Sequence, residues 1–394
     1  MSEVINLKRA SIATGLSFII NGLAVGSLYS RVPDFKRNLD ISTGTLGSAL
    51  FFAAFGVLTA LTIAGKFAAK YGSAPMTLLG GAAIVLTYPF LGLASSLPWL
   101  CLTLFLYGFT ASWQDLAMNA HALAIERRSS MRVLSRFHAM WSVGAVLGGA
   151  FGGIFAQHHI SIFRHFLTIA IVIALTHIYI RIGLLPASAD KHDFEGKKRV
   201  KRPRIFWYLG AIGFCAALSE GSAGDWGGVL LRDTFGATPF ISTIPYIFFA
   251  LMMVVGRLSG DHIAHKFGIR NSVTAFGALA GIGLIAGLII GGPIGISLGW
   301  FCLGLGISIV LPLMFSVAGE IAEQSYSTSI APSQAIAMVS GISYFGFLIG
   351  PPFIGVVAEL ISLRTAMLIP AALVLALAFA VRKVISGKDS ASGE

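Results

Sequence analysis

The sequence predicts an all-α membrane protein, with twelve transmembrane helices arranged as two pseudo-symmetric bundles of six helices. Hydrophobic residues make up 56% of the 394 residues, whereas Asp, Glu, Lys and Arg together make up only 11%. About a quarter of the residues of a soluble globular protein are charged, so this chain has too few charged side chains to cover a water-soluble fold. Long apolar stretches and a short internal repeat complete the prediction.

Twelve stretches are long and apolar enough to cross a bilayer, which takes about 20 helical residues. They lie near residues 10–30, 42–64, 74–95, 97–124, 133–156, 163–185, 205–228, 239–260, 272–291, 294–318, 333–357 and 363–382. The first stretch is too long for the apolar region of a signal peptide and lacks a small-residue cleavage site after it. We therefore expect it to remain as a helix, and an even number of helices leaves both termini on one side.

The basic residues predict which side that is, because loops on the cytoplasmic side carry an excess of Lys and Arg. Placing both termini in the cytoplasm puts most of the basic residues there, including those of the middle loop between Lys191 and Arg204. Topology and attraction to anionic lipid then explain the formal net charge of +11. We expect a multi-pass protein of the bacterial inner membrane and no nucleic-acid partner.

A polar, lysine-rich segment divides the chain into an N-terminal bundle, 1–185, a cytoplasmic basic linker, 186–204, and a C-terminal bundle, 205–394. The stretch Ala-Ala-Lys-Tyr-Gly at 68–72 recurs as Ala-His-Lys-Phe-Gly at 264–268, between the second and third helices of each half. Such a repeat is typical of transporters built from duplicated bundles, in which the substrate site lies at the bundle interface near the membrane midplane.

Several short stretches make the chain resemble the major facilitator superfamily over essentially its whole length. They are Gly65–Gly72, Asp115–Asn119, Glu126, Phe137-His138, Trp141-Ser142, Glu220-Gly221, Asp225-Trp226 and Gly256–Leu258. Within the superfamily, the chain is most similar to the YbjJ-like branch of bacterial inner-membrane transporters. The resemblance implies the fold and a role in transport. The family's loop aspartate is replaced by Ala69 in the first half, so a conformational lock through that aspartate is not expected there.

Polar residues on the fourth and fifth helices form the first candidate site. Asp115 and Asn119 share a helix face, and His138 and Trp141 are predicted at similar depth on the next helix. A carboxylate facing an imidazole can exchange a proton as access to a cavity changes; the alternative is a static Asp–His hydrogen bond that ties two helices. Asn21 on the first helix is a candidate cavity residue or a simple helix–helix contact.

The seventh helix carries the second candidate site. Residues 217–228 are rich in glycine, which lowers helix stability by about 1 kcal/mol per position against Ala, so we expect a bent or partly unwound outer half. Glu220 is predicted to carry a coupling proton or to contact substrate. The alternative is an outer gate, in which Glu220 pairs with Arg31, Arg232 or a polar neighbour. Asp225 is predicted to be a gate or cap residue.

Two further charged pairs are predicted to be structural clamps. Arg136 is expected to pair with Glu126 across the loop between the fourth and fifth helices, where charges near the interface cost little. Arg257 is placed near the cytoplasmic end of the eighth helix, and Asp261 follows four residues later, a spacing that favours an ion pair on one helix face.

The predicted function is secondary transport of a small polar solute by alternating access, coupled to protons. A passive facilitator of the same fold and a solute-binding membrane sensor are the alternatives. We do not expect an enzyme, because the chain has no G-x-S-x-G nucleophile motif and no HExxH pair. No metal, no cofactor and no partner chain are expected, and we predict a monomer.

Overall fold

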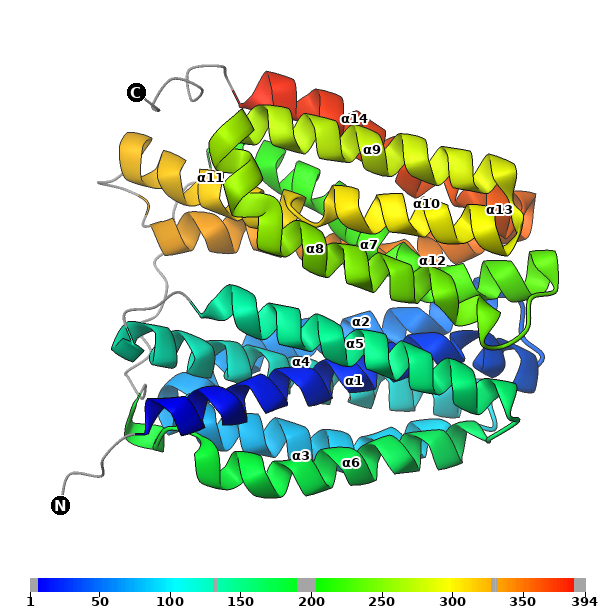
Figure 1. Ribbon diagram of the computed structural model, residues 1–394, viewed down its shortest axis with the longest axis horizontal. Helices are drawn as coiled ribbons and strands as arrows, with labels where there is room; N and C mark the ends of the chain where they lie inside the picture. The colour runs from blue at the N-terminus through cyan, green and yellow to red at the C-terminus, as the bar shows by residue number, and fades with distance from the viewer. Residues whose placement is uncertain (1–5, 130–132, 190–202, 327–329, 331, 386–394) are drawn as a thin grey trace. The chain divides into compact units, whose positions relative to one another are not determined.

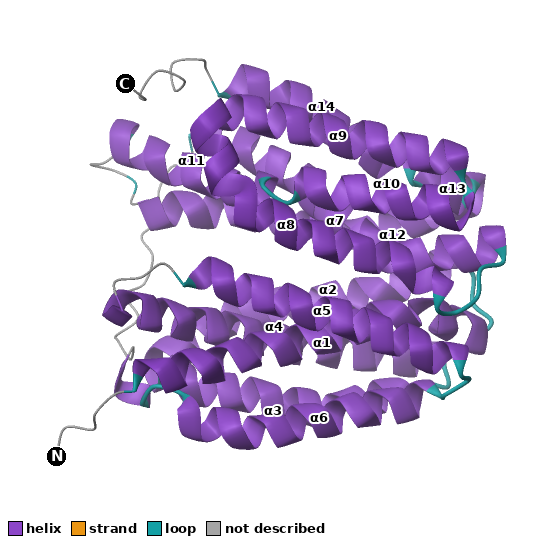
Figure 2. Ribbon diagram, viewed as in Figure 1, coloured by secondary structure: helices purple, strands orange, loops and turns teal. Residues whose placement is uncertain are grey.

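The computed structural model describes residues 6–129, 133–189, 203–326, 330 and 332–385. All regular secondary structure in these ranges is helical (Figure 2). The α-helices are α1 (Leu7–Asn38), α2 (Thr43–Tyr71), α3 (Ser73–Gly92), α4 (Leu97–Ser129), α5 (Leu134–Gln157), α6 (Ile162–Gly183), α7 (Arg204–Phe235), α8 (Ile244–Phe267), α9 (Ile269–Ile290), α10 (Gly292–Ile307), α11 (Val310–Ser325), α12 (Pro332–Ile361), α13 (Leu363–Ala366) and α14 (Leu368–Val384). Two 3₁₀ turns, Ala187–Ala189 and Ile241–Thr243, complete the helices (Figure 1).

The chain forms two compact units. Unit 1 comprises residues 1–42, 48–196 and 238–243, and unit 2 comprises residues 43–47, 197–237 and 244–394. The same helix pairs recur inside each unit: α1 packs on α5 and α3 on α4 and α6, while α7 packs on α12 and α9 on α10 and α14. The two units therefore repeat one internal plan, as the fold prediction requires.

Glycines bring α1 and α5 into close contact in unit 1. A Cβ added to Gly144 would overlap the carbonyl of Ile19, and one added to Gly22 would overlap the carbonyl of Trp141. Small residues at such positions let helix backbones approach closely in lipid, where packing rather than the hydrophobic effect drives association. Gly22 and Gly144 thus set the distance between the two helices that carry Asn21 and Trp141.

Eleven helical stretches in the described residues are long and apolar enough to cross a membrane, with α10 and α11 counted as one stretch. The twelfth predicted span, α4, has 33 residues and a length of about 50 Å, so its composition rather than its length sets it apart. Its second half carries Gln114, Asp115, Asn119 and His121. The predicted span that is not apolar enough to be among these stretches is therefore the one that bears the first candidate site.

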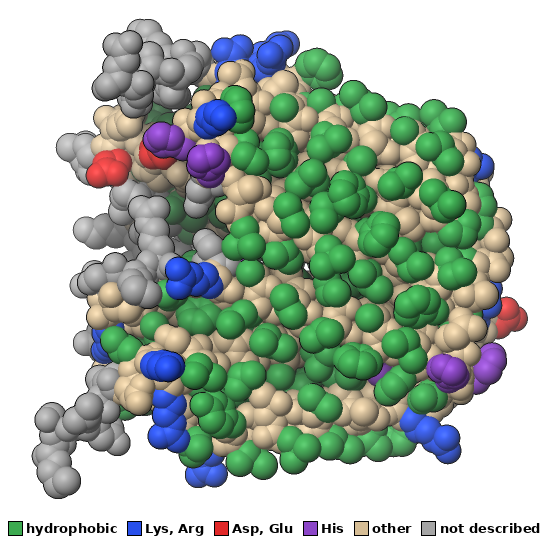
Figure 3. Space-filling model, viewed as in Figure 1, with side chains coloured by type: hydrophobic (Ala, Val, Ile, Leu, Met, Phe, Trp, Pro, Cys, Tyr) green, Lys and Arg blue, Asp and Glu red, His purple; other side chains and the backbone are tan. Residues whose placement is uncertain are grey.

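Large apolar side chains remain exposed on the outer faces of the helices. Leu86, Ile289 and Leu360 are 68%, 73% and 78% exposed, respectively. Figure 3 shows hydrophobic side chains spread along the helices, with Lys and Arg side chains near the helix ends. Such surfaces are favourable in hydrocarbon and unfavourable in water, which agrees with the membrane assignment.

The predicted break in the seventh helix is wrong, because α7 is one continuous α-helix through residues 217–228. Its glycines are packed instead of exposed: Gly227 lies against the indole of Trp300, whose N–H donates to the carbonyl of Ala223 over 2.9 Å. Packing of this kind outweighs the low helix propensity of glycine. Breaks occur elsewhere in unit 2, between α10 and α11 and between α13 and α14.

Candidate functional site

A chain of hydrogen bonds joins three helices in the interior of unit 1. The indole N–H of Trp141 on α5 donates to Asn21 Oδ1 on α1 over 2.9 Å. Asn21 Nδ2 in turn donates to Gln114 Oε1 on α4 over 3.0 Å and to the carbonyl of Ala111 over 3.1 Å. Asn21 and Gln114 are buried and Trp141 is half-buried. Every polar atom of Asn21 is used, which is what a buried amide in a membrane protein requires.

Asp115 and Asn119 contact each other on one face of α4. Asn119 Nδ2 donates to the backbone carbonyl of Asp115 over 2.8 Å and to its carboxylate over 3.2 Å. Both residues are half-buried in the second half of a membrane-crossing helix, where a charged group is tolerated only with a partner or near water. The shared face predicted from the spacing is therefore present.

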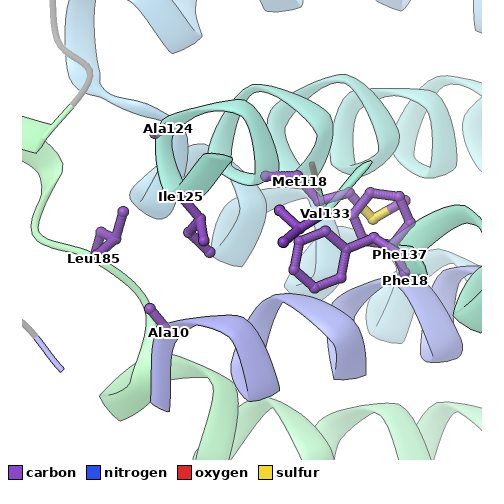
Figure 4. Packing of buried hydrophobic residues seen from close by; sticks show 9 residues of the cluster. Ala10, Phe18, Met118, Ala124, Ile125, Val133, Phe137 and Leu185 are labelled. Atoms are coloured by element: carbon purple, nitrogen blue, oxygen red, sulfur yellow. The ribbon is translucent and has the colours of Figure 1, made fainter. Parts of the chain in front are cut away.

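The ring of His138 lies against an aromatic cluster on α1 and α5. Its edge meets the face of Phe18 with ring centroids 5.4 Å apart, and Phe18 stacks on Phe137 at 5.5 Å. Figure 4 shows these two phenylalanines in the apolar cluster with Met118. Within the described residues, no hydrogen bond joins His138 to Asp115, so a direct Asp–His pair does not describe this conformation.

The carboxylate of Glu126 caps the N-terminus of α5. Its Oε2 accepts hydrogen bonds from the backbone N–H groups of Val133 and Leu134 over 2.8 and 3.2 Å. A helix N-terminus has unpaired N–H groups and a partial positive charge, both of which favour a carboxylate. Arg136 is exposed on the first turn of α5, so the helix terminus takes the place of the predicted Arg136 partner.

In unit 2, Glu220 and Arg257 form an ion pair between α7 and α8. Arg257 NH2 lies 3.2 Å from Glu220 Oε1, and the two side chains remain 26% and 21% exposed, respectively. Both residues lie near the middle of their helices. The placement of Arg257 at the end of its helix is thus wrong, because α8 continues to Phe267.

The other predicted gate residues have different surroundings. Arg31 is buried and forms an ion pair with Asp34 over 3.0 Å, and it also donates to the carbonyl of Ile160. Asp225 is buried on α7 without a hydrogen-bond partner among the described residues. The side chain of Asp261 lies outside the described part of the chain. The predicted Arg257–Asp261 pair therefore stays a prediction.

Sequence reasoning missed several buried polar residues of unit 1. Gln114 completes the Asn21 chain, and His121 joins Ser73 Oγ over 2.8 Å and accepts from the backbone N–H of Leu185 over 3.1 Å. His165 is fully buried with neither ring nitrogen hydrogen-bonded. A signal was present for Gln114, since it precedes Asp115 on α4, but only helix azimuth separates the buried amide from the half-buried carboxylate.

These features together describe a membrane protein with polar and charged groups held inside its helical units. The sequence matches the family model of the Major Facilitator Superfamily over residues 14–331. The chain belongs to this superfamily, whose members move solutes across membranes, and its class is therefore a membrane transporter of a small solute rather than an enzyme.

Particular relatives share most of the chain. It is 31% identical over 376 residues to an uncharacterized MFS-type transporter of Yersinia pestis, with 95% of each chain covered. It is 30% identical over 358 residues to an uncharacterized transporter of Sinorhizobium fredii, covering 88% of this chain and 90% of that one. Membrane protein MosC of Rhizobium meliloti is 27% identical over 360 residues, covering 90% and 85%. The narrower resemblance to the YbjJ-like branch stays a prediction.

Solved structures show the same fold at low identity. A mutant of the nucleoside transporter NupG superposes with a TM-score of 0.79 at 14% identity, covering 97% of this chain and all of that one. A bacterial homologue of the human lysosomal transporter Spinster, in an occupied inward-facing conformation, gives a TM-score of 0.74 at 16% identity and covers 95% of this chain and 96% of that one. At this identity the likeness concerns the fold alone.

Proposed function

We propose that the chain is a secondary active transporter that moves a small polar solute by alternating access and couples this movement to protons. The moving parts are the predicted bundles 1–185 and 205–394, joined by the basic linker. Both termini lie in the cytoplasm of a bacterial inner membrane, whose anionic lipids face the basic loops. The transporter works as a monomer, since each chain carries both bundles.

The observation that carries the coupling proposal is the Glu220–Arg257 pair. Charged side chains near the middle of membrane-crossing helices are expensive in hydrocarbon, yet about a quarter of each of these side chains is exposed. An exposed ion pair at that depth is tolerated if it faces water, so its open side faces an aqueous path. The proposed solute path in unit 2 therefore passes the titratable carboxylate of Glu220.

Protonation of Glu220 changes what Arg257 can bind. While Glu220 is ionised, its carboxylate forms an ion pair with the Arg257 guanidinium at 3.2 Å. A proton on Glu220 removes this charge, and the guanidinium is then free to donate to an acceptor group of the solute, which an Arg side chain does with up to five N–H groups. Binding of a proton and binding of solute are thereby linked in one site.

In unit 1, the half-buried polar residues are proposed to contact the solute. Four polar side chains on α4 and α5 are partly exposed: Asp115, Asn119, His138 and Trp141. Asn21 accepts a hydrogen bond from the Trp141 indole. Carboxylate, amide, imidazole and indole groups together offer donors and acceptors to a neutral, hydroxyl-rich or zwitterionic solute. The charged gate residues, Arg31, Glu126, Arg136, Asp225 and Asp261, are proposed to act away from the solute.

The test begins with a thermal-shift screen of sugars, amino acids, polyols and nucleosides on the purified protein, because a ligand that binds only the folded state raises its melting temperature. The solute found is then loaded into proteoliposomes with and without an imposed pH gradient. Accumulation driven by the gradient is expected for the natural chain and lost in Glu220→Gln, while the exposed Glu323→Gln behaves as the natural chain.

A flux that ignores the pH gradient but saturates with solute would instead indicate a passive facilitator. Ligand binding without any flux would indicate a membrane sensor. Gradient-driven accumulation that survives in Glu220→Gln would leave transport in place but remove Glu220 as the coupling residue.

A further inference from the structure

The hydrogen-bond chain of unit 1 has an open end on α4. Gln114 is completely buried, and its Oε1 accepts from Asn21, but its Nε2 has no hydrogen-bond partner. A buried amide N–H is unfavourable without a partner, so one is expected for this nitrogen. The neighbours of Gln114 Nε2 therefore decide which group ends the series of hydrogen bonds.

The rings and amides nearest to this nitrogen include His177 on α6, which packs against Gly81 on α3. The point where a Cβ on Gly81 would be placed is 2.7 Å from Gln114 Nε2 and closer still to His177 Nε2. The two nitrogens are therefore separated by less than twice this distance. Because neither has a hydrogen-bond partner, no direct bond joins them in this conformation, and the separation fits a bond through one water. His177 Nε2 is also buried without a partner.

The other ring nitrogen of His177 sets the tautomer. Nδ1 lies 3.2 Å from the backbone carbonyl of Ile173, and a carbonyl only accepts, so Nδ1 carries the hydrogen in this contact. In a neutral imidazole the second nitrogen, Nε2, then holds a lone pair and accepts. The unpaired donor of Gln114 thus faces an unpaired acceptor of His177.

We propose that His177 is the terminal acceptor of a hydrogen-bond relay across four helices that positions Trp141. All bonds of the relay run in one direction: from Trp141 to Asn21, from Asn21 to Gln114, from Gln114 through one water to His177, and from His177 to the Ile173 carbonyl. Bonds aligned in this way polarise and strengthen one another. His177 is a positioning residue, because it acts on Trp141 only through Asn21 and Gln114. The relay stands without the proposed function, on which only the role of Trp141 beside the solute depends.

Nuclear magnetic resonance of the full chain in lipid nanodiscs tests the relay without a solute. With ¹⁵N-labelled Trp and His, the Trp141 indole signal is assigned by its loss in Trp141→Phe, and the His177 signals by their loss in His177→Leu. We expect the Nδ1–H tautomer for His177. We also expect the Trp141 indole N–H signal to move in His177→Leu and to return toward its natural position in His177→Gln, whose side-chain oxygen accepts.

The control is Thr176→Val, one residue away, since Thr176 Oγ1 bonds only the carbonyl of Val172 on its own helix. It should leave the Trp141 signal unmoved. The carbonyl of Thr77 also interacts with the His177 ring, so an Nε2–H tautomer would mean that the ring donates to Thr77 and would overturn the relay. An unmoved Trp141 signal in a folded His177→Leu would overturn it as well. Neither result bears on whether the chain transports a solute.

Discussion

The polar interior of unit 1 and that of unit 2 handle the same physical problem in opposite ways. In unit 1, a chain of neutral amides and an indole joins three helices, with Asn21 buried and all its side-chain polar atoms bonded. In unit 2, a full ion pair, Glu220 with Arg257, stays partly exposed. A neutral network can be sealed from water, whereas an ion pair in a dry membrane interior pays a large desolvation cost.

The difference suggests a division of work. A sealed network of short hydrogen bonds favours one fixed geometry, which suits a surface that recognises a solute. An exposed ion pair can gain or lose a proton without unfolding its surroundings, which suits coupling. The predictions that follow test whether the two regions differ in this way, starting with the largest effect.

Replacing the cation of unit 2 should abolish coupled transport. In Arg257→Met, Glu220 loses its cation. Because about a quarter of each side chain is exposed, the cost stays below the roughly 3–5 kcal/mol of a fully buried charge pair. We expect solute accumulation in proteoliposomes to fall by roughly 100-fold or more. The measurement is the initial rate of solute uptake under an imposed pH gradient.

The double variant Arg257→Met with Glu220→Gln is the control for folding. It removes both charges together, which is far less costly than removing one, so expression and thermal stability should return while pH-driven uptake stays lost. Wild-type uptake by Arg257→Met would show that the pair is structural and would remove the contrast with unit 1.

Replacing Asn21, the residue that bonds both Trp141 and Gln114, should reduce the stability of the protein rather than proton coupling. Asn21→Leu leaves the Trp141 N–H and the Gln114 Oε1 unpaired in the interior, at about 2–4 kcal/mol in total. We expect this loss in the free energy of unfolding, measured by denaturant titration in detergent micelles. Asn271→Leu is the control, because the Asn271 side chain is exposed and bonds only the carbonyl of Phe267, and it should change stability by less than about 0.5 kcal/mol.

If Asn21→Leu keeps its stability but loses uptake driven by the pH gradient, the relay takes part in coupling and the two regions do not differ in their roles. Retained pH dependence with a weakened apparent affinity for solute would sharpen the contrast, since it would assign recognition to unit 1 and coupling to unit 2.

The helix contact beneath the relay provides a smaller test. In Gly22→Ala the new Cβ overlaps the Trp141 carbonyl, so α1 and α5 must move apart and the Trp141–Asn21 bond must lengthen. Overpacking of this kind costs about 1–3 kcal/mol, to be measured as the change in unfolding free energy. Gly341→Ala on α12 is matched in chemistry, but its Cβ would meet no atom within 4 Å, and it should be neutral or slightly stabilising. Equal losses in the two variants would mean that close packing does not hold the relay.

The two units also show which features of the structure can be predicted from the sequence. Composition and apolar length predict the helices, and residue spacing places Asp115 and Asn119 on one face, because both signals are local to one helix. The continuous α7 and the Glu220–Arg257 pair were not predicted, since each depends on packing between helices. An i, i+4 rule offers Asp261 as a partner for Arg257, and no local pattern indicates that Glu220 on α7 also lies within reach.

The same limit applies to unit 1. Asn21 and Trp141 are noticeable as polar and aromatic groups in apolar stretches, and both were selected as candidates. The bond between them depends on the glycine contacts that set the α1–α5 distance, and the roles of Gln114 and His177 depend on their azimuth toward α3. Sequence reasoning therefore finds the participants of a polar network more readily than its connections.

The smallest predicted effect concerns Glu126, whose carboxylate is bound by backbone N–H groups at the start of α5. Glu126→Gln keeps an oxygen that can accept from the Val133 and Leu134 N–H groups but removes the charge that favours the N-terminus of α5. The free energy of unfolding should therefore fall by about 0.3–1 kcal/mol.

The predicted Glu126–Arg136 clamp makes a different claim. In a double-mutant cycle with Arg136→Gln, the helix-cap interpretation gives a coupling free energy near zero, because Arg136 is exposed and contributes separately. A coupling of the same size as the single effect would restore the Glu126–Arg136 clamp in place of the helix cap.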